Sequence, residues 1–171
     1  MHDGQKNNEV EQLIKNMGQQ LASRISGYEK DKLLMIGIHT GGVWVAQRLC
    51  ELLELELPIG TLDISFYRDD FSRIGLNPQV KPSKLSTDVD GRHIILVDDI
   101  LHTGRTIRAA MNEIFDYGRP ASITLVALGE RSGRELPIQA DIVGKHFDLD
   151  SHEHVKLTGP EELKLSITQA P

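Results

Sequence analysis

Two adjacent carboxylates, Asp98 and Asp99, stand between an apolar run and a loop that reads Thr-Gly-Arg-Thr at residues 103–106. The apolar residues 94–97 predict a strand that is buried on both faces and ends at the acidic pair, where solvent can reach it. At the carboxyl edge of an open α/β sheet, such a loop and the N-terminus of the following helix can bind a phosphate. Neighbouring carboxylates can accept hydrogen bonds from vicinal hydroxyls or hold a hydrated Mg²⁺. The pattern therefore indicates a site for a ribose 5-phosphate.

Either half of this pattern alone has a simpler explanation. An aspartate pair at a strand end often caps a helix, and a glycine in a loop is often only a turn. The ordered combination of strand, acidic pair and Thr-Gly-Arg-Thr loop is more specific, which favours a functional site. It is not an NTP-binding P-loop, because the spacing Gly-x-x-x-x-Gly-Lys-[Ser/Thr] does not occur.

A second loop, residues 39–42, reads His-Thr-Gly-Gly between a predicted strand and a predicted helix. Two glycines permit backbone conformations that other residues avoid, so peptide N–H groups can turn toward a diphosphate. By itself, a Gly-Gly turn is more often structural than functional.

The rest of the sequence predicts the elements that position these loops. Apolar spacing predicts helices over residues 9–26, 43–53 and from residue 107 onward, and strands over residues 33–38, 59–66, 94–97, 121–128 and 141–147, with short strands at 155–157 and 163–167. Because strands and helices alternate, we expect one α/β domain with a parallel sheet over residues 1–171. Residues 67–91 have no periodicity, and so long a segment is usually functional or mobile.

Composition limits the classes of protein to which the chain can belong. With 171 residues, of which 39% are hydrophobic and 26% charged, it is expected to be a soluble domain with a real core. No apolar run approaches the ~18 residues of a membrane span, and the polar residues 2–8 are no signal peptide. The formal net charge of −6 argues against a general nucleic-acid binder. Cys50 lies in the apolar stripe of a predicted helix, as expected for a buried thiol in a reducing cytoplasm.

Residues 94–106 resemble the phosphoribosyl diphosphate (PRPP) signature of type I phosphoribosyltransferases. The resemblance implies a mostly parallel central sheet flanked by helices, a small hood over the base and a flexible loop over the active site. It also implies that Asp98 and Asp99 bind the ribose 2- and 3-hydroxyls and hold Mg²⁺ through water. The 5-phosphate would be enclosed by His102, Thr103, Gly104, Arg105 and Thr106, and the diphosphate by His39, Thr40, Gly41 and Gly42.

Four stretches narrow the resemblance to the PyrR family of pyrimidine-operon regulators with uracil phosphoribosyltransferase activity. They read "DISFYRDD", "ILVDDILHTGRTIRAA", "YGRPASITLVAL" and "RELPIQADIVGK", and the likeness runs from about Ile36 to Lys145. It implies that uracil N1 displaces diphosphate from C1 of PRPP and gives UMP. The flexible loop would span about residues 67–91, and the hood would comprise about residues 141–157 together with N-terminal residues.

The resemblance also implies residue roles in that reaction. Arg68 would shield or contact the diphosphate, whose charge Mg²⁺ would neutralise. Ile142 would stack on the base, while backbone groups of Val143 and Gly144 would pair with its polar edge. Purine enzymes of the superfamily place an aspartate where this chain has His102. This histidine could take the proton near neutrality or be a hydrogen-bonding loop residue, and both interpretations stay open.

The chain departs from the PyrR pattern on the surface that binds messenger RNA in the family. Gly41, Gly133 and Gln139 stand where related regulators carry charge or histidine, and the tail beyond Lys145 is acidic. We therefore expect only weak contact with a pyrimidine-leader RNA, through residues such as Arg134 and Lys145.

The favoured function is a cytoplasmic uracil phosphoribosyltransferase that can also regulate pyrimidine biosynthesis genes. One alternative is a regulator that senses UMP or PRPP, binds RNA or protein and catalyses little. A less favoured alternative is a salvage transferase for a purine base. The resemblance further implies a homodimer or homotetramer, and no membrane association is expected.

Overall fold

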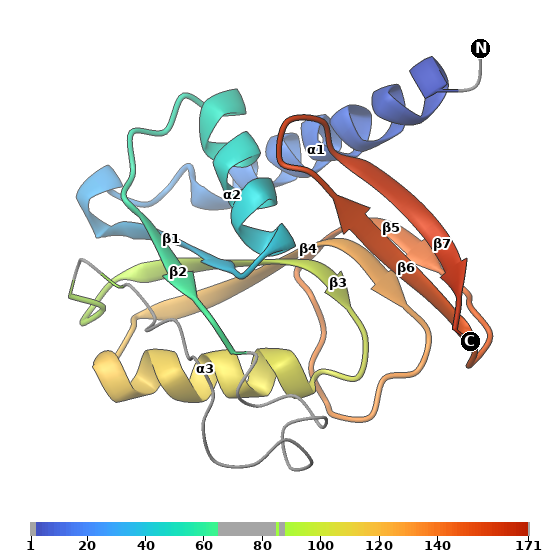
Figure 1. The fold of residues 1–171 in the computed structure, drawn as a ribbon. Helices are drawn as coiled ribbons and strands as arrows, with labels where there is room; N and C mark the ends of the chain where they lie inside the picture. Colours follow the sequence, from blue (N-terminus) through green and yellow to red (C-terminus); the bar gives the residue numbers. More distant parts are fainter. Residues whose placement is uncertain (1–2, 65–84, 86–87, 171) are drawn as a thin grey trace.

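The computed structural model describes residues 3–64, 85 and 88–170 of the chain. Within these residues, five parallel strands form a sheet in the order β2-β1-β3-β4-β5 (Figure 1). The strands are β1 (Leu33–Ile38), β2 (Ile59–Leu62), β3 (His93–Leu101), β4 (Ser122–Arg131) and β5 (Ile142–Phe147). The strand order reverses between β1 and β3, and in open α/β sheets ligands bind beyond the carboxyl ends of the strands at such a switch point.

Helices cover both faces of the sheet. The helices α1 (Asp3–Ile25) and α2 (Gly41–Leu52) lie on one face, and α3 (Arg105–Tyr117) lies on the other (Figure 1). A short 3₁₀ turn, η1 (Lys30–Lys32), leads into β1. Since α2 and α3 each follow a strand directly, both helices begin at the carboxyl edge of the sheet.

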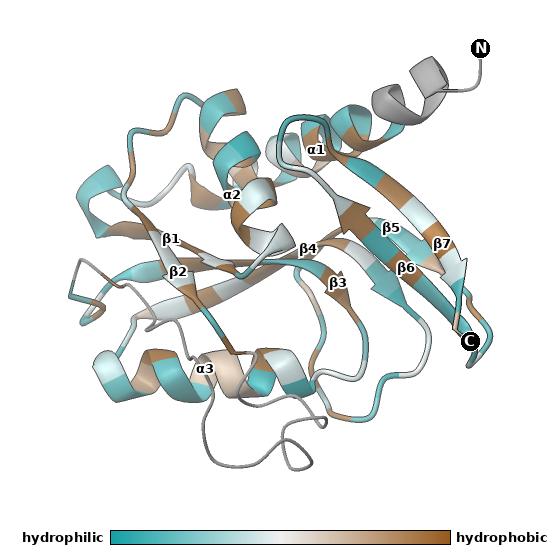
Figure 2. Cartoon of the chain, in the orientation of Figure 1, coloured by the Kyte–Doolittle hydropathy of each residue, from teal (hydrophilic) through white to brown (hydrophobic). Residues whose placement is uncertain are grey.

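Residues of the central strands alternate between two apolar cores. Leu33 and Met35 of β1 pack beneath α1 and α2, whereas Leu34, Ile36 and Ile38 pack on the α3 side. All of β1 is buried, as expected for a parallel strand covered on both faces. The hydropathy colouring shows brown stretches along β1 and β4 (Figure 2).

A separate antiparallel pair, β6 (Glu153–Thr158) and β7 (Lys164–Gln169), follows the sheet. It lies beside α1 and does not join the main sheet (Figure 1). Leu157 and Leu163 bury their side chains in the core under α1. The two short strands predicted near the end of the chain are thus confirmed. The role of residues 141–157 as a hood stays a prediction.

The strand that carries the acidic pair is longer than predicted. Asp98 and Ile100 continue the pairing with β4, opposite Ala127 and Gly129, so β3 runs on to Leu101. The acidic pair therefore lies inside the strand, and Asp98 is only 5% exposed. The expectation of a solvent-accessible pair was wrong for this residue, because backbone pairing continues where the apolar run ends.

Two further boundaries differ from the expectations. β2 ends at Leu62, and Ile64 is buried outside the strand, while Phe66 lies outside the described residues. α2 begins at Gly41 rather than at residue 43, because the two glycines already form its first turn. Most of the predicted flexible loop also lies outside the described residues, so its mobility stays a prediction. No helix in the described ranges is long and apolar enough to cross a membrane.

Candidate active site

The two loops singled out in the sequence meet at the carboxyl edge of the sheet. Residues 39–42 follow β1, and the neighbouring strand β3 carries the acidic pair. A methyl group at Gly41 would lie 2.5 Å from Oδ2 of Asp99, and one at Gly42 would lie 2.5 Å from the carbonyl oxygen of Val97. Only residues without a side chain let the loop lie this close to β3. The second loop and the acidic pair, far apart in sequence, therefore form one site.

His39 and Thr40, which open this second loop, are held from two sides. The N–H of His39 donates to the carbonyl oxygen of Leu62 (2.9 Å), and the N–H of Val43 donates to that of Thr40 (3.2 Å). The peptide bond between His39 and Thr40 is cis. The loop is thus tied to the end of β2 and to the start of α2.

The carboxylates of the acidic pair are fixed by backbone groups. Oδ1 of Asp98 accepts a hydrogen bond from the N–H of Asp99 (2.9 Å), and Oδ1 of Asp99 accepts one from the N–H of Ile100 (2.8 Å). The second oxygen of Asp99 faces Gly41. Oriented carboxylate oxygens at a sheet edge suit two hydroxyl donors or the water shell of Mg²⁺.

The loop before α3 leads into a helix N-terminus suited to an anion. Gly104 caps the helix with a φ of +95°, a conformation that favours glycine. The hydroxyl of Thr103 accepts a hydrogen bond from the N–H of Arg105 (3.2 Å), the first residue of α3. The first-turn N–H groups have no partner within the helix and carry the positive end of its dipole. Residues 102–106 thus present the groups that bind phosphate at helix starts.

A segment that the sequence did not assign to the site braces this loop. The N–H groups of Glu135 and Leu136 both donate to the carbonyl oxygen of Thr103 (3.0 and 3.1 Å). Arg105 pairs with Glu135 at 2.9 Å, but both side chains are 52% exposed, so the backbone bonds contribute more than the ion pair. These contacts join distant parts of the chain, and no local pattern signals them.

Residues 102–106 are called the phosphate loop below, after their predicted ligand. His102, the first of them, lies against Gly133 just after β4. A methyl group at Gly133, whose φ is +114°, would lie 2.9 Å from Nε2 of His102, so the ring packs against bare backbone. Burial lowers the pKa of His102, the charges of Arg131 and His154 lower it further, and Glu135 acts in the opposite direction. A neutral imidazole is therefore favoured near pH 7, and a neutral imidazole can accept a proton.

Comparison with known proteins identifies the family. A family model described as the phosphoribosyl transferase domain matches residues 5–159. A protein from Nitrosococcus oceani named bifunctional protein PyrR is 61% identical over 160 residues, which cover 92% of this chain and 90% of that protein. The protein of the same name from Pseudomonas paraeruginosa is 53% identical over 154 residues, covering 90% of this chain and 91% of that one. The chain belongs to the PyrR family of phosphoribosyltransferases.

Solved structures show the same fold as this PyrR-family chain. A hypoxanthine phosphoribosyltransferase from Staphylococcus aureus has a TM-score of 0.69 at 22% identity, covering 86% of this chain and 77% of its own. A purine phosphoribosyltransferase from Pyrococcus horikoshii has a TM-score of 0.62 at 22% identity, covering 81% of this chain and 83% of its own. The type I phosphoribosyltransferase fold expected from the resemblance is confirmed.

The segment predicted to bind the base in this PyrR-family chain is largely turned toward the core. Ile142 is 3% exposed and packs under α1, and the stacking role predicted for it stays a prediction. A methyl group at Gly144 would lie 2.8 Å from Sδ of Met17 in α1. Val143 is half-buried and pairs with Ala127 of β4. Strand alternation gives the reason, because residues 142 and 144 share the face that α1 covers.

The two predicted RNA contacts, Arg134 and Lys145, lie apart from one another. Arg68 lies outside the described residues. Arg134 lines a cavity of about 450 Å³ at the end of β4, whereas Lys145 lines a different cavity of about 330 Å³ beside α1. Lys145 also pairs with Glu9 and lies 5.2 Å from the ring centre of Phe147. The structure does not bring the two predicted RNA contacts into one cavity.

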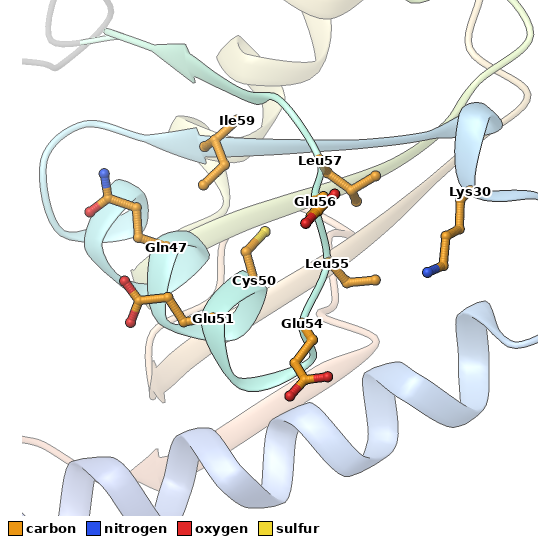
Figure 3. Close-up of a pocket in the computed structure, with 9 residues that line it drawn as sticks. All are labelled: Lys30, Gln47, Cys50, Glu51, Glu54, Leu55, Glu56, Leu57 and Ile59. Carbon is orange, nitrogen blue, oxygen red and sulfur yellow. The ribbon is translucent and has the colours of Figure 1, made fainter.

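A further cavity of about 900 Å³ lies near the opposite edge of the sheet, beside α2 and the start of β2 (Figure 3). Cys50 lines it and is 7% exposed. Burial raises the pKa of the Cys50 thiol to about 11, and the charge of Glu51 contributes. The thiol therefore stays protonated at neutral pH, as expected for a buried structural cysteine.

Proposed function

We propose that this PyrR-family chain is a uracil phosphoribosyltransferase that converts uracil and PRPP to UMP and diphosphate, and that it also regulates pyrimidine biosynthesis genes. The observation that carries the proposal is the 61% identity to a bifunctional PyrR protein over 92% of the chain. The family match spans residues 5–159, which include both loops and the acidic pair.

The proposed PRPP site combines three sets of groups. The ribose hydroxyls would donate to Asp98 and Asp99, whose oxygens backbone N–H groups hold in place. The 5-phosphate would lie on residues 102–106 at the start of α3, and the diphosphate would lie on residues 39–42 at the start of α2. Arg68 is proposed as a further diphosphate contact. Because β1 and β3 are neighbours, a single ribose can span the two loops.

Phosphoribosyltransferases generally use Mg²⁺ together with PRPP. The donor set at the acidic pair fits this ion, because Mg²⁺ prefers carboxylate oxygens and keeps several of its waters. We propose that Asp98 and Asp99 would hold it through water. Bound Mg²⁺ supplies charge neutralisation of the diphosphate leaving group.

Uracil N1 loses its proton during the reaction, and we propose His102 as the acceptor. Its lowered pKa keeps the ring neutral near pH 7, the state that a general base requires. The close approach of Gly133 limits the positions open to the ring, although His102 as a whole is exposed.

We propose that contact with a pyrimidine-leader RNA is weak. Such binding depends on lysine and arginine charges that are free to meet phosphates. Lys145 is paired with Glu9, and Arg24 is paired with Asp141 at 3.0 Å. Arg134 is exposed and remains the best candidate contact. The active protein is also proposed to be a dimer or tetramer, which light scattering after gel filtration would test.

A radiometric assay with uracil, PRPP and Mg²⁺, run beside adenine, hypoxanthine and orotate, tests the transferase. We expect UMP from uracil and little product from the other bases, because a base with the wrong donors and acceptors leaves buried polar groups unpaired. Faster transfer to adenine or hypoxanthine would overturn the uracil assignment. Binding of PRPP without transfer to any base would favour a sensor with little catalysis.

A further inference from the structure

Arg131, the last residue of β4, is a buried cation that is only 7% exposed. Its Nη1 donates to the carbonyl oxygen of Glu153 (2.6 Å), and its Nη2 donates to that of Asp150 (3.3 Å). None of the ion pairs within the described ranges joins Arg131 to a carboxylate. A buried arginine usually needs partners that compensate its charge. The two shortest hydrogen bonds of Arg131 provide them through these two backbone carbonyl oxygens.

Both partners of Arg131 belong to residues 147–153, which we call the wall segment. Ser132, the next residue after Arg131, also binds this segment. The N–H of Ser132 donates to the carbonyl oxygen of Phe147 (3.0 Å). The hydroxyl of Ser132 donates to the carbonyl oxygen of Leu149 and accepts from the N–H of the same residue, both at 3.2 Å. The end of β4 thus fixes the backbone of the wall segment at several successive points.

The residues after Ser132 reach the opposite side of the site. Gly133 packs against the ring of His102, and Glu135 donates to the carbonyl oxygen of Thr103. Residues 131–136 therefore join the wall segment to the phosphate loop. His154, directly after the wall segment, is close enough for its charge to affect His102. Since Ser132 binds the wall segment and Gly133 contacts His102, the wall segment lies close to residues 102–106.

We propose that Arg131 is a positioning residue for the base, because its hydrogen bonds to Asp150 and Glu153 fix the wall segment as one side of the pyrimidine pocket. The inference rests on the proposed uracil phosphoribosyltransferase activity. PRPP is assigned to the loops after β1 and β3, which Arg131 does not hold. Loss of Arg131 therefore weakens base binding and leaves PRPP binding in place.

The test compares Arg131→Met, Arg131→Lys and a matched control, Arg92→Met. Arg92 also donates to a backbone carbonyl, that of Asp31 (2.6 Å), but at the opposite edge of the sheet. Arg131→Met should raise KM for uracil at least ~10-fold, the scale of a lost charged hydrogen bond, and change KM for PRPP by less than about 2-fold. Arg131→Lys, which keeps the charge, should recover part of the loss. Arg92→Met should match the parent.

Two outcomes would overturn the proposal: an unchanged KM for uracil, or equal rises in both KM values. If Arg131→Met does not fold, Ser132→Ala decides, since it must raise KM for uracil selectively. Hydrogen exchange separates this proposal from the proposed function. If the parent makes no UMP, the transferase assignment fails, and Arg131→Met must still accelerate amide exchange within residues 147–153. Absence of that acceleration contradicts the positioning role.

Discussion

Asp98 and Asp99 contribute two properties to the proposed ribose site, the orientation of their oxygens and their negative charge. Replacing both with asparagine keeps an oxygen that can accept the N–H groups of Asp99 and Ile100, so the fold should persist. The charge is lost, and we expect PRPP affinity in the presence of Mg²⁺ to fall at least ~100-fold. Calorimetric titration of the double variant checks this, with thermal unfolding as the control. Unchanged PRPP affinity would show that the ribose binds elsewhere.

His102 can be either the proton acceptor or a hydrogen-bonding residue of the loop, and its substitution separates these two roles. If it accepts the uracil proton, His102→Ala should lower kcat at least ~100-fold and barely change KM. The pKa of His102 is lowered, so its neutral form persists at pH values below the ordinary pKa of histidine. The acid limb of kcat/KM in the parent should therefore lie below that ordinary value.

The control for this prediction is His146→Ala, which removes a histidine that is 74% exposed and pairs with Glu130. It should match the parent. A His102→Ala variant that turns over within a few-fold of the parent would make His102 a structural residue of the loop.

Single residues also show where sequence patterns stop being informative. Residue types and local spacing marked the acidic pair and the second loop as candidate ligand-binding groups, and the structure places them side by side. Arg131 gave no such signal, since its partners lie on a segment that only the fold brings near. Local spacing did not signal that Ile142 is buried, because helix packing decides which side of β5 α1 covers. The stacking role expected of this residue stays a prediction.

At the scale of elements, the alternating pattern predicted the parallel sheet, and the order of strands explains why the two candidate loops lie together. β1 and β3 are neighbours in the sheet, although a long stretch of sequence separates them. The helices that follow both strands therefore begin at the same carboxyl edge. The sequence could not define the end of β3, because pairing with β4 carries the strand beyond its apolar run.

Because the second loop lies so close to β3, adding one methyl group to this loop should weaken PRPP binding. In Gly41→Ala the methyl would meet the Asp99 carboxylate, so the loop must move away from β3. We expect PRPP affinity to fall at least ~10-fold, in line with the cost of overpacking. Gly27→Ala is the matched control, because no heavy atom lies within 4 Å of the added methyl. Equal PRPP affinities in the two variants would contradict the diphosphate assignment.

At the scale of the whole molecule, charge distribution separates the two activities that the PyrR family combines. The proposed transferase site consists of backbone groups, hydroxyls and two carboxylates, and it does not depend on a basic surface, whereas the chain has a net charge of −6. RNA binding instead requires free cations over a wide surface. Ion pairs engage Lys145 and Arg24, two of the cations nearest to β5. We therefore expect the transferase activity to be stronger in this chain than RNA binding.

Binding to a pyrimidine-leader hairpin should accordingly be weak, salt-sensitive and little changed by UMP. Filter binding at two salt concentrations, with and without UMP, measures this. Glu9→Gln frees Lys145 from its ion pair and should strengthen binding and steepen its salt dependence, since each added phosphate contact increases the slope. Glu29→Gln changes the net charge equally but precedes η1, at the opposite edge of the sheet, and should have a smaller effect. The prediction would be contradicted if the parent bound the hairpin tightly, bound it more tightly with UMP, and distinguished loop mutants of the hairpin. Such binding would require a recognition surface that does not depend on these cations.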